Sequence, residues 1–97
     1  MMILICYDVM VTHEAGTRRL RQVSKICKNY GQRVQFSVFE CIVTPADYIY
    51  LKEKLKQTID HETDSLRFYL LGKNWQKSVE MMGKIKSYDP EKDTFAF

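Results

Sequence analysis

Apolar residues form continuous or alternating runs in several parts of the chain, and these runs predict strands. Residues 2–9 are almost entirely apolar, which is typical of a strand covered on both faces. Residues 33–43 and 65–71 are rich in aliphatic and aromatic side chains and also favour extended structure. Two shorter apolar segments, 79–82 and 94–97, predict a short strand and a terminal strand.

Two other segments show the apolar spacing of helices. The first helix is predicted over residues 16–30, and Gly31 after it has the position of a left-handed C-cap. The second begins at Thr44, which can cap the helix, with Pro45 in its first turn. Its apolar residues then recur at helical spacing: Tyr48, Leu51, Leu55 and Ile59.

The order of these elements predicts the α+β class, with a two-layer sandwich of helices on a sheet. Two helices can cover only one face of a sheet, yet the strands carry apolar residues on both faces. In residues 33–43 one face would carry Val34, Phe36 and Val38, and the other Phe39, Cys41 and Val43. Because a second apolar face on a small domain usually marks an oligomer interface, we predict a homodimer.

Length and composition exclude several classes of protein. The 97 residues fit a single domain, 1–97, and 45% apolar with 28% charged residues excludes a disordered chain. No apolar run reaches the ~18 residues of a membrane span, and the apolar start lacks the basic flank of a signal peptide. The cysteines form no C-x-x-C pair, so free thiols are expected at Cys6, Cys27 and Cys41. We therefore expect a cytoplasmic protein that does not bind membranes.

The positive charge is concentrated in the predicted first helix. The net charge is +3, and residues 1–40 carry the whole surplus. One helix face is a row of bases, Arg18, Arg21, Lys25 and Lys28, about 15 Å long at 1.5 Å per residue. No acid between residues 15 and 39 can pair with them. Such a row can follow several phosphates of a nucleic acid; the alternative is an ordinary solvated helix face.

Arg19 differs from the other bases of this helix because it lies at the edge of the apolar arc. Two positions are open to its side chain. It can extend along the apolar surface to water, or it can reach over the rim of the sheet toward the end of the first strand.

Asp8 is a candidate metal ligand at the end of the first strand. A carboxylate there, just before a loop and a helix, suits Mg²⁺, which prefers oxygen ligands and keeps several waters. The alternative is that Asp8 hydrogen-bonds its own loop or pairs with an arginine. One carboxylate makes a poor metal site, but a twofold axis could bring two copies together. Such a site could activate water against a phosphodiester.

The remaining candidates carry less chemistry. His13 is close enough to Asp8 in sequence to act as a proton shuttle, whereas His61 lies in another predicted loop; neither has metal-ligand spacing. The strand aromatics could stack bases but more often belong to a core: Tyr7, Phe36, Phe39, Phe68 and Tyr69. The chain contains no Gly-rich phosphate loop and no nucleophile elbow.

Several segments, taken in order, resemble the CRISPR-associated Cas2 family. They are ILICYDV (3–9), GTRRLRQV (16–23), CKNYG (27–31), RVQFSVFEC (33–41) and DSLRFY (64–69). Together they span most of the chain. The VFEC strand and the LGKNW segment (71–75) are most similar to members of subtype I-C.

This resemblance implies a ferredoxin-like βαββαβ two-layer sandwich. Residues 94–97 would be an extra C-terminal strand that can add to the partner's sheet. The fold requires residues 33–43 to be a hairpin with a bend near Ser37. From the residues alone a single kinked strand is equally possible, because the segment contains no Gly, Pro or Asn.

The resemblance also implies a function in CRISPR adaptation, the acquisition of spacers for antiviral defence in prokaryotes. Members are endonucleases that act on RNA or double-stranded DNA, with Mg²⁺, or Mn²⁺ in its place, at the position of Asp8. The homodimer bridges dimers of the Cas1 integrase and holds the spacer duplex. The matching basic residues are Arg18, Arg19, Arg21, Lys25, Lys28 and Arg33.

Three hypotheses follow. The leading one is a dimeric, Mg²⁺-dependent endonuclease of CRISPR adaptation with Asp8 as its metal ligand and catalytic residue. The second is a non-catalytic dimeric scaffold that binds spacer DNA through the basic helix. The third, a regulatory domain that binds a small molecule, is disfavoured because the chain has no Gly-rich or obviously polar pocket.

Overall fold

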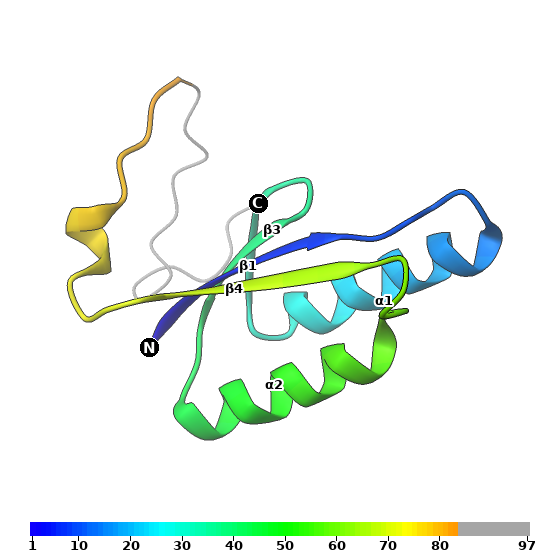
Figure 1. Ribbon diagram of the computed structural model, residues 1–97. Helices are drawn as coiled ribbons and strands as arrows, with labels where there is room; N and C mark the ends of the chain where they lie inside the picture. The colour runs from blue at the N-terminus through cyan, green and yellow to red at the C-terminus, as the bar shows by residue number, and fades with distance from the viewer. Residues whose placement is uncertain (84–97) are drawn as a thin grey trace.

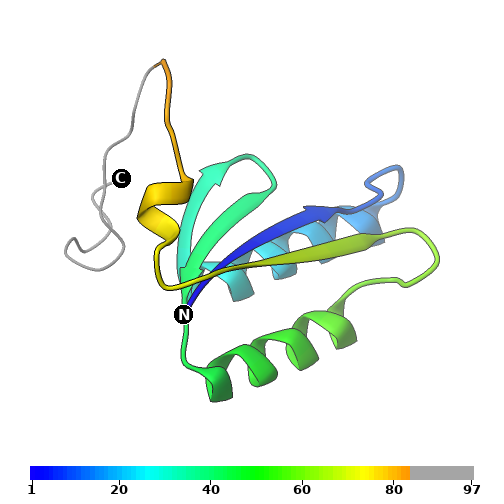
Figure 2. The same ribbon diagram turned by 60° about the vertical axis from the view of Figure 1, so that its left-hand side comes forward.

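A computed structural model describes residues 1–83. The elements in chain order are β1 (Met2–Asp8), α1 (Glu14–Lys28), β2 (Gly31–Gln35), β3 (Val38–Ile42), α2 (Pro45–Thr58), β4 (Ser65–Leu71) and a 3₁₀ turn, η1 (Trp75–Ser78). The strands form one antiparallel sheet in the order β2-β3-β1-β4, and both helices lie on the same face of it (Figures 1 and 2). The predicted α+β, two-layer βαββαβ arrangement is confirmed. The predicted C-terminal strand, 94–97, lies outside the described residues.

The segment after α1 is a hairpin, not a single kinked strand. β2 and β3 pair antiparallel and are joined at Phe36 and Ser37, with an irregular register between Arg33 and Gln35. The turn contains no glycine, and β1 supports it from the side. The backbone N–H of Tyr7 donates to the Ser37 carbonyl (3.1 Å), and the Tyr7 hydroxyl donates to the Phe36 carbonyl (3.4 Å). Because the chain turns here, the prediction that Val34, Phe36 and Val38 share one strand face is wrong.

The core lies between the helices and one face of the sheet. Ile3 and Ile5 of β1 stand opposite Cys41 and Phe39 of β3, and all four are buried. The helices add their buried apolar residues to this layer: Val23, Ile26 and Cys27 from α1, Leu51 and Leu55 from α2. Phe39, Cys41 and Val43 therefore share one face, as the alternation predicted, and the structure shows that this face is the core side.

The other face of the sheet has no described helix over it (Figure 2). Leu4 and Cys6 of β1 are half-buried there, and Asp8 follows them on the same side. We call this side, which bears Leu4, Cys6 and Asp8, the open face. The homodimer was predicted from a second apolar face carried by Val34, Phe36 and Val38, whereas in β1 the apolar residues on this side are Leu4 and Cys6.

The cysteines are free, as predicted, since no disulfide joins the three. Burial raises the pKa of both the Cys27 and the Cys41 thiol to about 12, so these two remain protonated at neutral pH. None of the described helices is both long and apolar enough to cross a membrane.

Two details of the predicted elements are wrong. Gly31 is not a left-handed C-cap: α1 ends at Lys28 with Asn29 as its C-cap, and Gly31 opens β2. An added Cβ on Gly31 would lie 2.1 Å from the Glu40 carbonyl oxygen. The glycine is needed for close strand packing. Residues 79–82 form no strand, because after η1 the chain leaves the sheet without pairing with any described strand.

Candidate nucleic-acid and metal site

Asp8 ends β1 on the open face, opposite Ser65 of β4. Val9 after it is buried and holds the strand end in the core, while the Asp8 side chain is exposed. Within residues 1–83, no group donates a hydrogen bond to its carboxylate or forms an ion pair with it. The alternative roles considered for Asp8, a loop hydrogen bond or an arginine pair, are therefore not seen. Its oxygens remain available to a ligand.

A single chain offers a divalent metal few ligands. In residues 1–83, no three His, Cys, Asp or Glu side chains lie close enough to hold an ion. His13 is exposed and directly precedes α1, with no side-chain hydrogen bond to it. One exposed carboxylate suits Mg²⁺, which binds proteins through one or two carboxylates and keeps its other positions for water and phosphate. Asp8 therefore fits such an ion if a second copy supplies a second carboxylate.

The open face also carries a basic side chain, Arg67, that sequence reasoning missed. Arg67 of β4 is opposite Cys6, two residue pairs along from Asp8 and Ser65 and on the same face. Its Nη1 donates to the Tyr69 hydroxyl (3.2 Å), and this contact raises the pKa of the guanidinium above its ordinary value. No described carboxylate pairs with it. Period-two alternation could have found Arg67 once the pairing of β1 and β4 was known.

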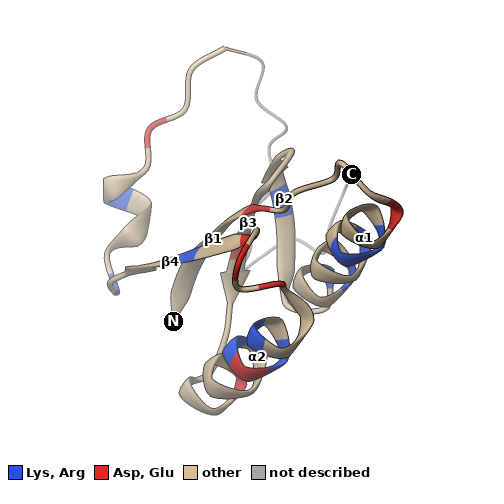
Figure 3. Ribbon diagram, turned by 45° about the vertical axis from the view of Figure 1, so that its right-hand side comes forward, with Lys and Arg blue, Asp and Glu red and all other residues tan. Residues whose placement is uncertain are grey.

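Most of the predicted basic residues meet around one hollow. It has a volume of about 350 Å³ between α1 and the β2–β3 hairpin. All the charged side chains that line it are basic: Arg21, Lys25 and Lys28 from α1 and Arg33 from β2. Figure 3 shows Lys and Arg along α1 and on β2. Arg18 is exposed on the same helix but does not line the hollow. We refer to this site as the basic hollow.

Arg33 is held in place at the edge of the basic hollow. Its guanidinium donates to the Ser24 hydroxyl of α1. The same group lies 5.2 Å from the ring centroid of Phe39 and 5.9 Å from that of Phe36, within the range of cation–π attraction. These contacts leave its positive charge without a described carboxylate partner.

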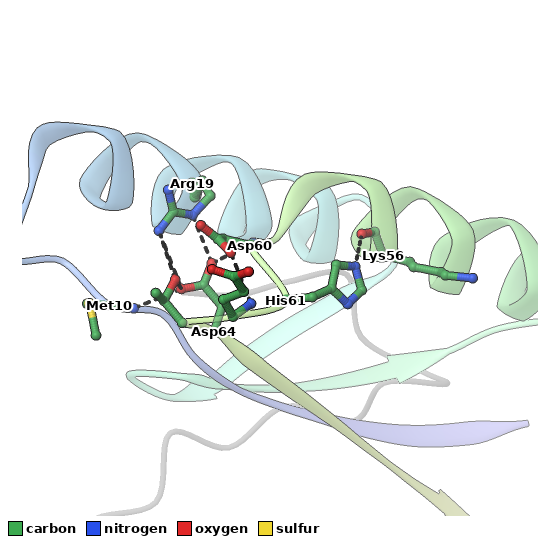
Figure 4. A network of polar contacts seen from close by, with 8 residues as sticks. Met10, Arg19, Lys56, Asp60, His61 and Asp64 are labelled. Carbon is green, nitrogen blue, oxygen red and sulfur yellow. Dashed lines mark hydrogen bonds and ion pairs between the residues drawn. The ribbon is translucent and has the colours of Figure 1, made fainter.

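Arg19 has a different environment from the other bases. Its Nε donates to Oδ2 of Asp64 at 2.8 Å. This ion pair joins α1 to the residue just before β4. Figure 4 shows Arg19 pointing at Asp64 beside Met10 and Asp60. Of the two positions considered for Arg19, the structure shows the one that reaches over the rim of the sheet.

Asp64 is the centre of this network, and sequence reasoning gave it no role. Oδ1 accepts from the Met10 N–H (3.0 Å) and the Thr63 hydroxyl (3.1 Å), and Oδ2 also accepts from the Asp60 N–H (2.9 Å). Burial alone would raise the pKa of Asp64, but the hydrogen bonds from Arg19, Asp60, Met10 and Thr63 outweigh it and lower the pKa from 3.8 to about 2. Asp64 therefore ties the loop after Asp8 to α1 and to the start of β4.

A glycine completes the loop between Asp8 and α1. A Cβ on Gly16 would lie 1.9 Å from the Met10 carbonyl oxygen, so only glycine permits the helix to approach the loop this closely. α1 begins at Glu14, two residues before the predicted start. At the other side of the network, His61 is a structural residue whose ring contacts the Lys56 carbonyl at 2.9 Å (Figure 4).

Comparison with known families gives one match over most of the chain. The family described as CRISPR associated protein Cas2 matches residues 1–79. A CRISPR-associated endoribonuclease Cas2 of Nitratidesulfovibrio vulgaris is 53% identical over 91 residues, which cover 94% of this chain and 89% of the relative. A CRISPR-associated endonuclease Cas2 of Halalkalibacterium halodurans is also 53% identical over 91 residues, 94% of this chain and 95% of the relative.

Solved structures give the same result. The crystal structure of Streptococcus pyogenes Cas2 at pH 6.5 matches with a TM-score of 0.77 and 60% identity, over 86% of this chain and all of that one. A chain of a partial Cas6-RT-Cas1–Cas2 complex matches with a TM-score of 0.61 and 31% identity, over 99% of this chain and 91% of that one.

Proposed function

The chain belongs to the CRISPR-associated Cas2 family, and we propose that it is a metal-dependent endonuclease of CRISPR adaptation. Its substrates are the phosphodiesters of RNA or double-stranded DNA. The relatives named endoribonuclease and endonuclease support this reaction class. The observation that carries the proposal is the exposed Asp8 carboxylate, which has no described partner and lies at the same end of the sheet as the turn that borders the basic hollow.

We propose a homodimer in which the two Asp8 side chains meet across the open face. Its half-buried Leu4 and Cys6 offer an apolar surface on which a second copy can pack. Residues 94–97 would extend the sheet of the partner. Sedimentation of the chain at micromolar concentration should give a dimer, and a monomer would contradict both this packing and a two-carboxylate site.

Each group then has a defined task. When bound, Mg²⁺ or Mn²⁺ supplies a water of lowered pKa and neutralises charge on the phosphate. The paired Asp8 carboxylates would hold this ion. Arg67 on the open face places a positive charge near the same phosphate. Arg18, Arg21, Lys25, Lys28 and Arg33 bind the flanking phosphates, and Arg19 acts indirectly by positioning the loop after Asp8 through Asp64.

The second candidate function is a non-catalytic scaffold. The match to a chain of a complex that contains Cas1 supports assembly with an integrase, and this assembly needs the basic surface but not the metal. We propose that the dimer bridges integrase dimers whether or not it cleaves. We also propose that the chain is most similar to members of subtype I-C and acts in a prokaryotic cytoplasm.

The experiment that tests catalysis is cleavage of labelled RNA and duplex DNA over a Mg²⁺ titration by the wild type and by Asp8→Asn. Loss of a metal ligand should reduce the rate by more than the 10–100-fold typical of an outer-shell change. The shape of the side chain is kept, so the dimer and duplex binding should persist. Equal cleavage by the two proteins would remove the catalytic function and leave the scaffold.

A further inference from the structure

The basic hollow has a second property besides its charge, an exposed aromatic ring. Phe36, at the β2–β3 turn, is 76% exposed and lines the hollow together with Tyr7 and Leu20. Because most of this side chain lies outside the core, its ring is accessible to a ligand. Its ring is close to the Arg33 guanidinium (5.9 Å from the centroid), so an aromatic surface and a phosphate-binding group lie side by side.

From this arrangement we propose that the basic hollow binds one unpaired nucleotide of a single-stranded RNA or DNA, with its base stacked on Phe36 and its phosphate on Arg33 and Lys28. The proposal rests on the proposed function in taking nucleic acid as the ligand. It goes further in assigning a base-binding residue, Phe36, beside the basic side chains that bind phosphates along α1.

Size and charge both favour this occupant. A volume of about 350 Å³ is near the lower limit of ligand pockets, roughly 300–1,000 Å³, and suits a single nucleotide. The lining carries four basic side chains and no carboxylate, so it is complementary to a phosphate. Only an unpaired base has a free face to stack on a protein ring, because the bases of a duplex stack on one another.

The position of the hollow links it to Asp8. Tyr7, which lines the hollow, directly precedes Asp8, and its backbone N–H is bonded to Ser37 of the same turn (3.1 Å). Successive residues of a strand point to opposite faces, so the Tyr7 ring is on the core side and Asp8 on the open face. A single-stranded nucleic acid held by one nucleotide in the hollow can therefore cross the end of the sheet and bring its next phosphodiester toward Asp8.

The test is equilibrium binding, without divalent ions so that nothing is cleaved. The probes are fluorescein-labelled hexauridylate, the deoxythymidine hexamer, a chain of six abasic sugar phosphates and a 20-base-pair DNA duplex. Phe36→Ala should weaken binding of both hexamers by about 5- to 150-fold, the range for loss of one stacked base. It should leave binding of the abasic chain and of the duplex unchanged. Preference for one hexamer identifies the sugar that the site accepts.

Further variants separate stacking from structure. Phe36→Leu keeps an apolar side chain at the turn and should lose hexamer binding as Phe36→Ala does. Phe36→Trp should retain binding, and its fluorescence should be quenched by hexamers but not by the abasic chain. Tyr50→Ala is the matched control, since Tyr50 is an exposed aromatic residue of α2 beside a lysine and lies outside the hollow.

Two results would overturn the proposal. One is wild-type affinity of Phe36→Ala or Phe36→Leu for both hexamers. The other is an equal loss of affinity for the abasic chain, which would mean that Phe36 only supports the hairpin. The Asp8→Asn cleavage experiment is independent of these outcomes: if that variant cleaves normally while Phe36→Ala loses the hexamers, the nucleotide site stands and the catalytic function does not.

Discussion

Two aspartates lie at the same end of the sheet and differ in almost every other respect. Asp8 ends β1 opposite Ser65, and Asp64 is the residue just before Ser65. The carboxylate of Asp64 is buried and accepts hydrogen bonds from one side of α1, the loop after β1 and its own loop. That of Asp8 is exposed and has no described partner. The Asp64 carboxylate is satisfied by the protein, so of the two only Asp8 can bind a ligand.

The same contrast separates two neighbouring arginines. Arg18 and Arg19 are adjacent in α1, but one residue turns the side chain by about 100° around the helix. Arg18 is exposed to solvent, whereas Arg19 is half-buried and ion-paired with Asp64. Identical side chains therefore have different tasks because of helix geometry. One binds phosphate in the proposed function and the other fixes the loop that follows Asp8.

Among the substitutions that test this comparison, Asp64→Asn should have the largest effect on the free energy of unfolding. The substitution removes the charge that compensates Arg19 and puts an amide N–H₂ where donors converge, so we expect a loss of about 3 kcal/mol in the free energy of unfolding. Urea denaturation at neutral pH measures it. Asp8→Asn is the matched control and should unfold at the wild-type urea concentration. Equal stability of all three proteins would show that Asp64 has no structural advantage over Asp8.

The pH dependence of stability tests the role of Asp64 by protonation instead of by substitution. The pKa of Asp64 is lowered from 3.8 to about 2 in the folded state, so the folded protein binds fewer protons than the unfolded chain in this interval. Its contribution is complete above about pH 4 and is lost as the pH falls through 2. The wild type should therefore lose more stability than Asp64→Asn between pH 4 and 2.

A smaller effect is expected from the two arginines, compared by Arg18→Gln and Arg19→Gln. Arg19→Gln leaves a buried carboxylate with its backbone donors but no cation, and should lower the free energy of unfolding by less than Asp64→Asn does. Arg18→Gln should leave stability unchanged and lower the slope of log affinity for duplex DNA against log salt by ~0.9, the value of one phosphate contact. Denaturation and binding from 50 to 200 mM salt separate the two. An unchanged slope would make Arg18 a solvated residue.

Periodicity and local chemistry predicted most elements of the fold. The apolar run of β1, the capping residues Thr44 and Pro45, and the helical spacing of α2 all depend on contacts within a few residues, and the structure has them where predicted. Thr44 accepts from the Asp47 N–H (3.1 Å). The position of Asp8 at the end of β1 also followed from the sequence. Its exposure did not, because the continuous apolar run predicted a strand covered on both faces, whereas one face of β1 is only partly buried.

Other features depended on contacts between segments far apart in the chain. The turn at Phe36 and Ser37 contains no Gly, Pro or Asn and is supported by Tyr7, 29 residues from Phe36. Gly31 is required by the backbone of β3, not by the end of a helix. Asp64 and Arg19 are 45 residues apart, and nothing local indicates that one compensates the other.

The sequence by itself thus determined the strands, the helices, a basic helix face and a carboxylate at a strand end, since each is set by the residue and its near neighbours. Only the tertiary structure decided which carboxylate is satisfied and which is free, which arginine is paired, and that Phe36 and Arg33 share a hollow with α1. These depend on distances between elements. Pairing and packing set such distances, and they leave no periodic trace in the sequence.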